Sequence, residues 1–182
     1  MFKAFLAAII GAVIAFGWSS ISWIALPFHE DTLNGFENES AIAEAIRKEV
    51  KEPGIYILPG DKSMEQEAKM EAMKNGPFLF ASIRPGKDED MSMGKSMVRG
   101  FTSTLVASIL LAIMLGAVAP RLNYAGRVGF VVLMTLFTAI VGFYPNQIWW
   151  EFSTGFVLCN IMDAIIGWGL AALVMAGMIN GK

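Results

Sequence analysis

Residues 152–179 read FSTGFVLCNIMDAIIGWGLAALVMAGMI, a stretch in which Asp163 is the one charged residue. Three other stretches, residues 4–28, 100–120 and 128–150, contain no charged residue. A helix needs about 20 residues to cross the hydrocarbon core of a bilayer, and each of these stretches exceeds that length. None of them shows the alternating pattern of a barrel strand. The four stretches therefore predict four transmembrane helices.

The composition of the chain agrees with a membrane protein. Of the 182 residues, 55% are hydrophobic without counting glycine and 16% are charged, whereas soluble domains have about 25% charged residues. The charges are also clustered, because residues 28–100 hold 10 of the 14 Lys and Arg and 14 of the 16 Asp and Glu. This pattern excludes a soluble globule and a disordered chain. It predicts an α-helical integral membrane protein with a small polar α/β insert between its first and second helices.

We expect the chain to divide into three parts. These are a first transmembrane helix in residues 1–27, an extracytoplasmic α/β module in residues 28–98, and transmembrane helices two to four in residues 99–182. The first stretch also resembles a signal peptide, but it continues to Leu26 without a clear small-residue cleavage site. The first helix is therefore expected to be an uncleaved anchor that ends at Pro27.

The polar module carries the sequence signals of alternating helices and strands. In chain order we first expect a helix from a Ser40 cap to about Val50 and a strand in GIYILPG at 54–60. A second helix is expected to follow a capping box at 63–66 and to stop at Asn75–Gly76. A second strand is expected in PFLFASIRPG at 77–86. A strand–helix–strand order predicts parallel pairing of the two strands. Met64, Met70 and Met73 are expected to fill a thin core. Such a small module is expected to need contacts with the membrane helices or with a partner for its stability.

The basic residues outside the module predict the orientation. With four spans, one side of the membrane receives Lys3, Arg121, Arg127 and Lys182. The opposite loop, residues 144–152, has no Lys or Arg. Cytoplasmic loops carry the excess of basic residues, so both termini are expected in the cytoplasm of a bacterium, with the protein in the inner membrane. Aromatic residues then gather at the outer interface, namely Trp18, Trp23, Trp149 and Trp150.

Asp163 is the sharpest candidate for a functional residue. It lies 13 residues after Trp150, which is roughly 20 Å along a continuous helix and therefore near the middle of the membrane. A carboxylate there costs about 2.5–3.5 kcal/mol on insertion scales, and its neutral form is favoured. Asn160 and Gly167 share its helix face. We interpret Asp163 first as an assembly residue that is hydrogen-bonded to Asn160 or to Ser and Thr of other spans. The alternatives are a proton or cation site, or an ion pair with a cation of another subunit.

Small residues form a second pattern in the predicted spans. Gly11 lies in an Ala7–Gly11–Ala15 series, Gly116 follows Ala112 by four positions, and Gly167 precedes Ala171 by four. Such faces let helix backbones approach closely. They are expected to serve packing within the chain first and association between chains second.

Methionine, histidine and cysteine supply the remaining candidates. Met91, Met93 and Met97 form a run of thioethers, the soft ligands that select Cu(I), although the same run can simply begin the second transmembrane helix. His29 is the only histidine, is expected at the membrane interface, and cannot alone form a multi-histidine metal site. Cys159 is the only cysteine and is expected to behave as a small hydrophobe.

The sequence contains no recognisable catalytic or nucleotide-binding motif and no basic stripe for nucleic acid. We therefore expect a non-enzymatic accessory, assembly or scaffolding subunit of a larger membrane complex, without a cofactor. Its expected partners are the lipid bilayer and either other integral membrane subunits or further copies of itself. The first alternative is a small transporter or channel component that uses Asp163. The second is periplasmic copper handling by the methionine run.

Overall fold

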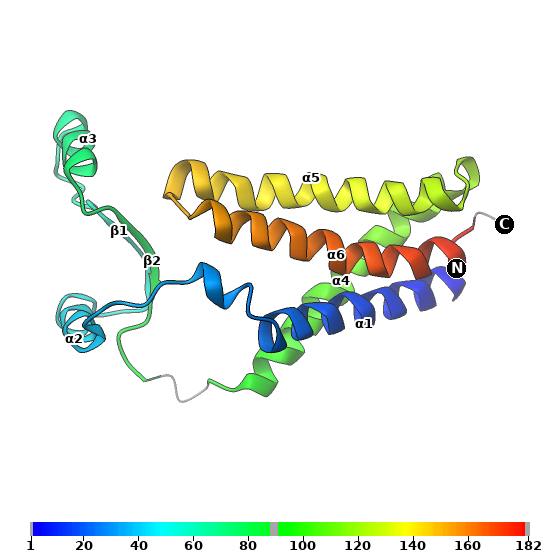
Figure 1. Ribbon diagram of the computed structural model, residues 1–182, viewed down its shortest axis with the longest axis horizontal. Coiled ribbons are helices and arrows are strands. Elements are labelled where there is room, and N and C mark those ends of the chain that lie inside the picture. Colours follow the sequence, from blue (N-terminus) through cyan, green and yellow to red (C-terminus); the bar gives the residue numbers. More distant parts are fainter. Residues whose placement is uncertain (1, 88–90, 181–182) are drawn as a thin grey trace. The chain divides into compact units, whose positions relative to one another are not determined.

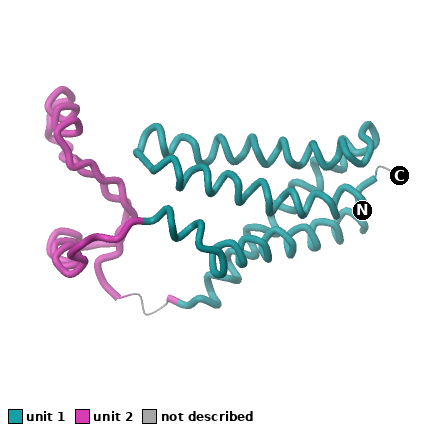
Figure 2. Tube along the Cα trace, in the orientation of Figure 1, with its two compact units in different colours: residues 1–33, 92–182 teal, residues 34–91 magenta. Residues whose placement is uncertain are grey.

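The computed structural model of the chain describes residues 2–87 and 91–180. Figure 1 shows its elements in chain order, which are α1 (Phe2–Ala25), η1 (Glu30–Thr32), α2 (Glu39–Glu49), β1 (Gly54–Leu58), α3 (Gln66–Asn75), β2 (Leu79–Ile83), α4 (Met93–Val118), η2 (Ala119–Arg121), α5 (Tyr124–Trp150) and α6 (Thr154–Met178). The chain forms two compact units (Figure 2). Met1–Leu33 and Ser92–Lys182 form the helical unit, and Asn34–Met91 form the polar unit.

The helical unit contains four helices that are long and apolar enough to cross a membrane, namely α1, α4 with η2, α5 and α6. Helix α1 packs against both α4 and α6, and α6 also packs against α5 (Figure 1). Helices α4 and α5 make few contacts with each other although they are consecutive in the chain. The first and last helices therefore form the centre of the bundle.

Small residues let α1 and α6 approach each other closely. Ala7, Ala15, Ala171 and Ala172 are buried between the helices, and Leu115 and Met175 fill the space beside them. The Ser108 hydroxyl of α4 donates a hydrogen bond of 2.7 Å to the Ala8 carbonyl oxygen of α1. Without a hydrophobic driving force between helices in lipid, contacts of this kind determine how the helices associate.

Side chains and turns end the helices of this unit. Arg127 at the start of α5 donates from Nε to the Ala176 carbonyl oxygen near the end of α6, over 2.9 Å. Glu151 adopts a left-handed conformation with φ of 56° and ends α5, and Ser153 caps α6 by accepting a hydrogen bond from the Phe156 amide. Because α6 begins only at Thr154, Asp163 lies about 14 Å along that helix, which is less deep than a helix continuous from Trp150 predicts.

The polar unit has the predicted order of helix, strand, helix and strand, but the prediction of parallel pairing is wrong. Strands β1 and β2 are antiparallel, with Gly54 opposite Ile83 and Leu58 opposite Leu79. Parallel pairing needs the connecting helix to carry the chain back along the sheet. Here α3 lies within the connection between Leu58 and Leu79, so the strands form a hairpin with a helical loop.

The helix ends of the polar unit agree only partly with the sequence signals. Asn38, rather than Ser40, caps α2 by accepting a hydrogen bond of 3.0 Å from the Ala41 amide. The capping box is also absent, because the Ser63 hydroxyl and amide both donate to Asp61 instead. These two hydrogen bonds lower the pKa of the Asp61 carboxyl, the side-chain bond more than the backbone bond. Gly76 ends α3 as predicted, with φ of 66°.

The polar unit has almost no core. Within its described residues only Val50 is buried. Met70 and Met73 are 51% and 39% exposed, so the prediction that methionines fill a core is wrong for these two residues. The larger exposed apolar side chains of this unit are Phe36, Ile42, Ile55, Ile57, Leu58, Met70, Met73, Leu79 and Met91.

Candidate functional site

Asp163 is part of a buried polar cluster in the helical unit. Its side chain, on α6, is only slightly exposed, and its Oδ1 accepts a hydrogen bond of 2.7 Å from the Trp18 indole Nε1 of α1. Its predicted partner Asn160 forms a different hydrogen bond. Asn160 donates to the Phe156 carbonyl oxygen of its own helix over 2.8 Å. Trp18 therefore has a hydrogen-bonding role inside the bundle that its predicted place at the interface did not include.

His29 is the second member of the cluster, and its side chain is buried within the helical unit. It is 2% exposed, with Nε2 2.9 Å from the Ser22 hydroxyl oxygen and 3.7 Å from Asp163 Oδ2. Its ring stacks on Trp23 with 3.9 Å between centroids and 16° between planes. The imidazole is thus held in one orientation, between a hydroxyl group and a carboxylate.

Cys159 completes the cluster on the other edge of the imidazole. Its Sγ lies 3.4 Å from His29 Nδ1, and it is also 3.6 Å from the Phe28 carbonyl oxygen. Cys159 precedes Asp163 by one helical turn, so α6 presents both side chains to the same ring. The thiol is partly exposed, whereas His29 and Asp163 are buried.

A turn after α1 brings His29 back over its own helix. Helix α1 ends at Ala25, just before Pro27, because proline cannot donate an amide to the helix. The Asp31 amide donates to the Pro27 carbonyl oxygen over 3.0 Å, and the Thr32 hydroxyl donates to the His29 carbonyl oxygen over 2.7 Å. This turn places His29 beside Ser22, seven residues earlier in the chain.

The three predicted packing glycines have different surroundings. A Cβ atom added at Gly11 would lie 2.5 Å from Met175 Sδ and 2.9 Å from Ser108 Oγ, so a larger residue here would force these side chains to shift. At Gly167 the added atom would lie 2.9 Å from Trp18 Cδ1, so this glycine makes room for the indole that reaches Asp163. At Gly116 the added atom meets nothing within 4 Å.

The methionine run lies at and just before the start of α4. Met91 and Met93 are 72% and 74% exposed, and Met91 Sδ lies 3.5 Å from an Arg84 nitrogen that can donate to it. Met93 begins α4, with Met97 one turn later. Among the described residues there is also no group of three His, Cys, Asp or Glu side chains placed to hold a metal ion.

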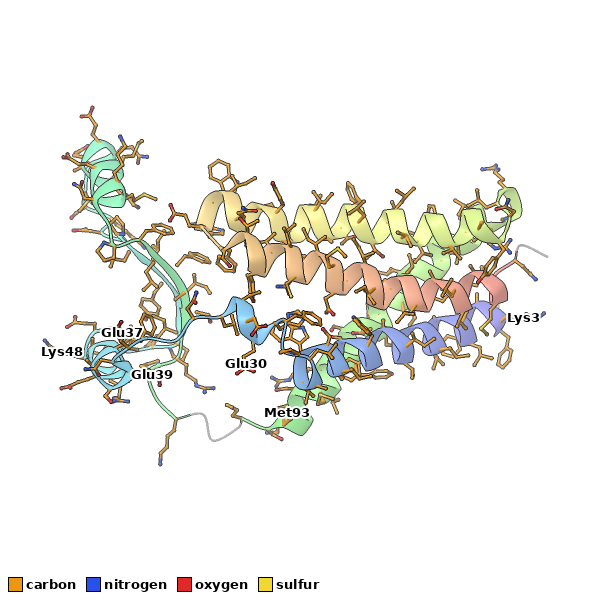
Figure 3. The ribbon with its side chains drawn as sticks, in the orientation of Figure 1. Lys3, Glu30, Glu37, Glu39, Lys48 and Met93 are labelled. Atoms are coloured by element: carbon orange, nitrogen blue, oxygen red, sulfur yellow. The ribbon has the colours of Figure 1, made fainter. Side chains whose placement is uncertain are left out.

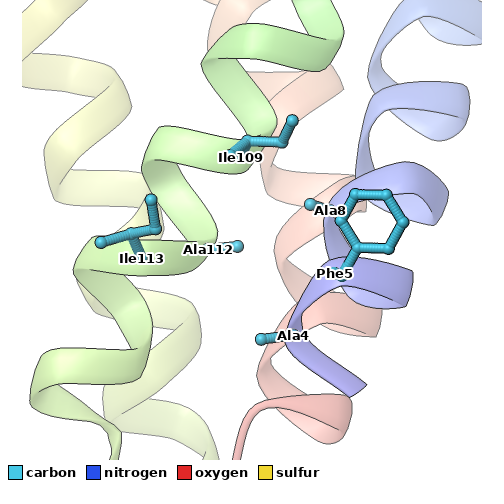
Figure 4. A pocket seen from close by; sticks show the side chains of 6 residues that line it. All are labelled: Ala4, Phe5, Ala8, Ile109, Ala112 and Ile113. Atoms are coloured by element: carbon cyan, nitrogen blue, oxygen red, sulfur yellow. The ribbon is translucent and has the colours of Figure 1, made fainter. Parts of the chain in front are cut away.

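Two pockets on the helical unit are almost entirely apolar. One, of about 240 Å³, lies between α1 and α4, where Phe5 and Ile109 face each other with four small or aliphatic neighbours (Figure 4). The other, of about 620 Å³, lies between α4 and α5 and is lined by side chains such as Met114, Phe137 and Trp168. Neither lining includes Asp163, His29 or Cys159.

The buried cluster is therefore the candidate chemical site of the helical unit. It holds a thiol, an imidazole, a hydroxyl group and a carboxylate in contact. Sequence reasoning identified Asp163 but not His29, although Pro27 followed by Glu30 and Asp31 signals a turn at that point. Comparison of the chain with models of protein families, with curated proteins and with solved structures gives no match.

Proposed function

We propose that this protein is an accessory or assembly subunit of a larger membrane complex, and that the polar unit is its partner-binding part. The observation that supports this function is the uncovered apolar surface of the polar unit. Ile55 is 64% exposed, Phe36 is 61% exposed, and only Val50 is buried among the described residues of this unit.

A two-stranded hairpin is marginally stable in water unless its apolar face is covered. Here β1 and β2 form a sheet of two strands, so each strand has one edge without a pairing partner in the sheet. Such edges can accept a further strand from another chain. Charged residues such as Arg47 and Lys48 lie in the same unit, so a protein surface suits this unit better than the hydrocarbon of a bilayer.

The proposed location is the bacterial inner membrane, with both termini in the cytoplasm and the polar unit outside. Lys3 lies at one end of the helical unit, and Glu30 and Met93 lie at the opposite end (Figure 3). The connection between α4 and α5, which contains Arg121, lies at the same end as the N-terminus, and Arg127 follows in the first turn of α5 (Figure 1). The opposite end carries Lys95 and Arg99 of α4 together with Glu30, Asp31 and Glu151, whereas the described residues at the Lys3 end include no acidic side chain. The end with the excess of basic residues is the end expected in the cytoplasm.

Site-specific photo-crosslinking in intact cells tests the partner-binding proposal. A photoreactive amino acid is placed at Ile55 of the tagged full chain, and at exposed Glu44 of α2 as a matched control. We expect Ile55 to give a discrete adduct with another protein or a second copy, several-fold stronger than Glu44. Adducts from Ile55 that map only to the helical unit of the same chain would contradict the proposal.

Labelling of single cysteines tests the orientation. In a Cys159→Ser background, cysteine at Asn38 should react with an impermeant maleimide in intact cells, and cysteine at Asn123 should react only after lysis. The reverse result would place the polar unit in the cytoplasm.

A transporter component remains the second candidate because His29 supplies a second titratable group 3.7 Å from Asp163. Proton movement along a membrane needs such neighbouring groups. Both groups, however, lie toward the end of the unit where α6 begins, and the described part of the other spans places no further charged side chain beside them. Loss of an ion flux in Asp163→Asn with assembly intact would favour this candidate over the first.

A further inference from the structure

We propose that Cys159, His29 and Asp163 form a thiol nucleophile site that accepts acyl groups from lipid-phase esters or thioesters. This inference is independent of the proposed partner-binding role of the polar unit. It rests on residues of the helical unit alone.

The two ring nitrogens of His29 have different neighbours. His29 Nδ1 faces Cys159 Sγ at 3.4 Å, and His29 Nε2 faces the Ser22 hydroxyl at 2.9 Å and Asp163 Oδ2 at 3.7 Å. An activated nucleophile has this arrangement, with a base in reach of the thiol and a third group that orients the base. With the proton on Nε2, Nδ1 is free to accept the thiol proton.

The side chains of His29 and Asp163 are held in fixed positions. The His29 ring is stacked on Trp23 and is 2% exposed. The other carboxylate oxygen of Asp163 accepts the Trp18 indole N–H, which leaves Oδ2 directed at the imidazole. Preorganised groups of this kind lose little freedom when the reaction begins.

Cys159 is also more accessible than its two partners. It is a partly exposed residue, whereas His29 and Asp163 are buried. It lies five residues after the start of α6, or about 7.5 Å along the helix. In a spanning helix this depth is close to the ester groups that separate lipid headgroups from acyl chains.

The reaction that this geometry suits is transfer of an acyl group to sulfur. Cys159 Sγ attacks the acyl carbonyl carbon, the C–S bond forms, and the bond from that carbon to the leaving oxygen or sulfur breaks. His29 Nδ1 takes the thiol proton and returns it to the leaving group. The products are a thioester on Cys159 and an alcohol or a thiol. Asp163 acts as a positioning residue in this proposal, because a carboxylate 3.7 Å from Nε2 favours electrostatically a proton on that nitrogen.

The test uses the full chain reconstituted in lipid vesicles with two acyl donors in separate arms. One donor is phosphatidylethanolamine with an alkyne on its acyl chain, and the other is an alkyne-palmitoyl thioester of N-acetylcysteamine. We expect an adduct that hydroxylamine removes and that Cys159→Ser abolishes. The donor that reacts identifies the source of the acyl group.

A matched control separates activation from mere accessibility. The variant Cys159→Ser with Leu158→Cys carries a thiol at nearly the same depth, at a position whose native side chain is 49% exposed. We expect Cys159 to acylate at least about tenfold faster than this thiol, since general base catalysis is worth 10²–10⁴-fold. His29→Gln should reduce the rate at Cys159 to that of the control.

The role of Asp163 has a readout of its own. Because His29 is the only histidine, labelled histidine gives one imidazole signal in NMR spectra, and its nitrogen shifts report which nitrogen carries the proton. Asp163→Asn should weaken the preference for Nε2–H. No adduct with either donor, or acylation of Cys159 no faster than of the Leu158→Cys control, would overturn the proposal even if His29→Gln fails to fold.

Discussion

The helical unit and the polar unit both expose many apolar side chains, but different surroundings can cover the two surfaces. In the helical unit, Leu133 and Phe137 are 64% and 63% exposed on a helix long enough to cross a membrane, so lipid can cover them. In the polar unit, Ile55 is 64% exposed on a strand of five residues. Apolar side chains among charged residues need protein to cover them.

The two units also differ in how their polar groups are satisfied. Among the described residues, every buried side-chain nitrogen and oxygen has a hydrogen-bond partner, and the largest group of them, around Asp163, lies in the helical unit. The helical unit thus satisfies its buried polar groups within the chain, whereas the apolar side chains of the polar unit are left exposed among the described residues. The predictions below address this difference, beginning with the largest expected effect.

The polar unit should lose its fold when separated from the rest of the chain. A fragment of residues 30–90 should show weak and poorly cooperative thermal unfolding by circular dichroism. The reason is that only Val50 is buried among the described residues of the unit, and domains of about 70 residues rarely gain more than ~3–5 kcal/mol from their cores. A sharp transition above roughly 60 °C, as in robust mesophilic domains, would remove the difference between the units.

The helical unit should be sensitive to Asp163. Asp163→Leu leaves the Trp18 N–H and His29 without their carboxylate in a buried site, which should cost about 2–4 kcal/mol of stability. Asp163→Asn keeps the shape and one acceptor and should cost less than half of that. Thermal unfolding in detergent measures both.

Asn160→Leu is the control for this experiment. Within the described part of the chain, Asn160 bonds only to the carbonyl oxygen of Phe156 on its own helix, so its replacement should change stability by less than about 1 kcal/mol. Equal losses for Asp163→Leu and Asn160→Leu would show that the cluster does not stabilise the bundle.

Close helix packing should make Gly11 and Gly116 respond differently to the same change. Gly11→Val places atoms against Met175 and Ser108, so overpacking should reduce stability by about 1–3 kcal/mol. Gly116→Val meets open space and should stay within about 0.5 kcal/mol. If the two variants unfold at the same temperature in detergent, α1 does not pack as closely as described.

The smallest expected effect concerns a single turn of the polar unit. Hydrogen bonds from Ser63 lower the pKa of Asp61 below its ordinary value. Their contribution is therefore present above the ordinary carboxyl pKa of about 3.9 and is lost as the pH falls through the lowered value. Ser63→Ala removes the stronger of the two bonds and should raise the pKa of Asp61 in a carboxyl NMR titration of the full chain. An unchanged titration would show that the turn does not form.

The sequence predicts the helical unit better than the polar unit for a physical reason. A span must satisfy its backbone internally, so a long uncharged stretch has one available structure. The α1 helix accordingly ends just before Pro27, and the four predicted spans are four long helices. The pairing direction of β1 and β2 depends instead on the path of the chain through α3, which no local pattern specifies.

The candidate site likewise has one residue that the sequence predicts and others that it does not. Asp163 is visible in the sequence because a charge in an apolar stretch is rare. Its partners Trp18 and His29 are 145 and 134 positions away in the chain, and their approach results from the packing of α1 on α6. An aromatic residue near a helix end is also common at membrane interfaces, so nothing local distinguishes Trp18 from Trp23.

The packing of α1 between α4 and α6 has a consequence for biosynthesis. Translation delivers Trp18 before Asp163 by 145 residues, which at about 5–20 residues per second is on the order of ten seconds. During that interval α1 can associate with α4 but not with α6. The small-residue face that contains Ala7, Gly11 and Ala15 therefore lacks its contacts with α6. We therefore expect the contacts between α1 and α6 to form only after the final helix has left the ribosome. A ribosome stalled before α6 would leave that face free to pair with another nascent chain.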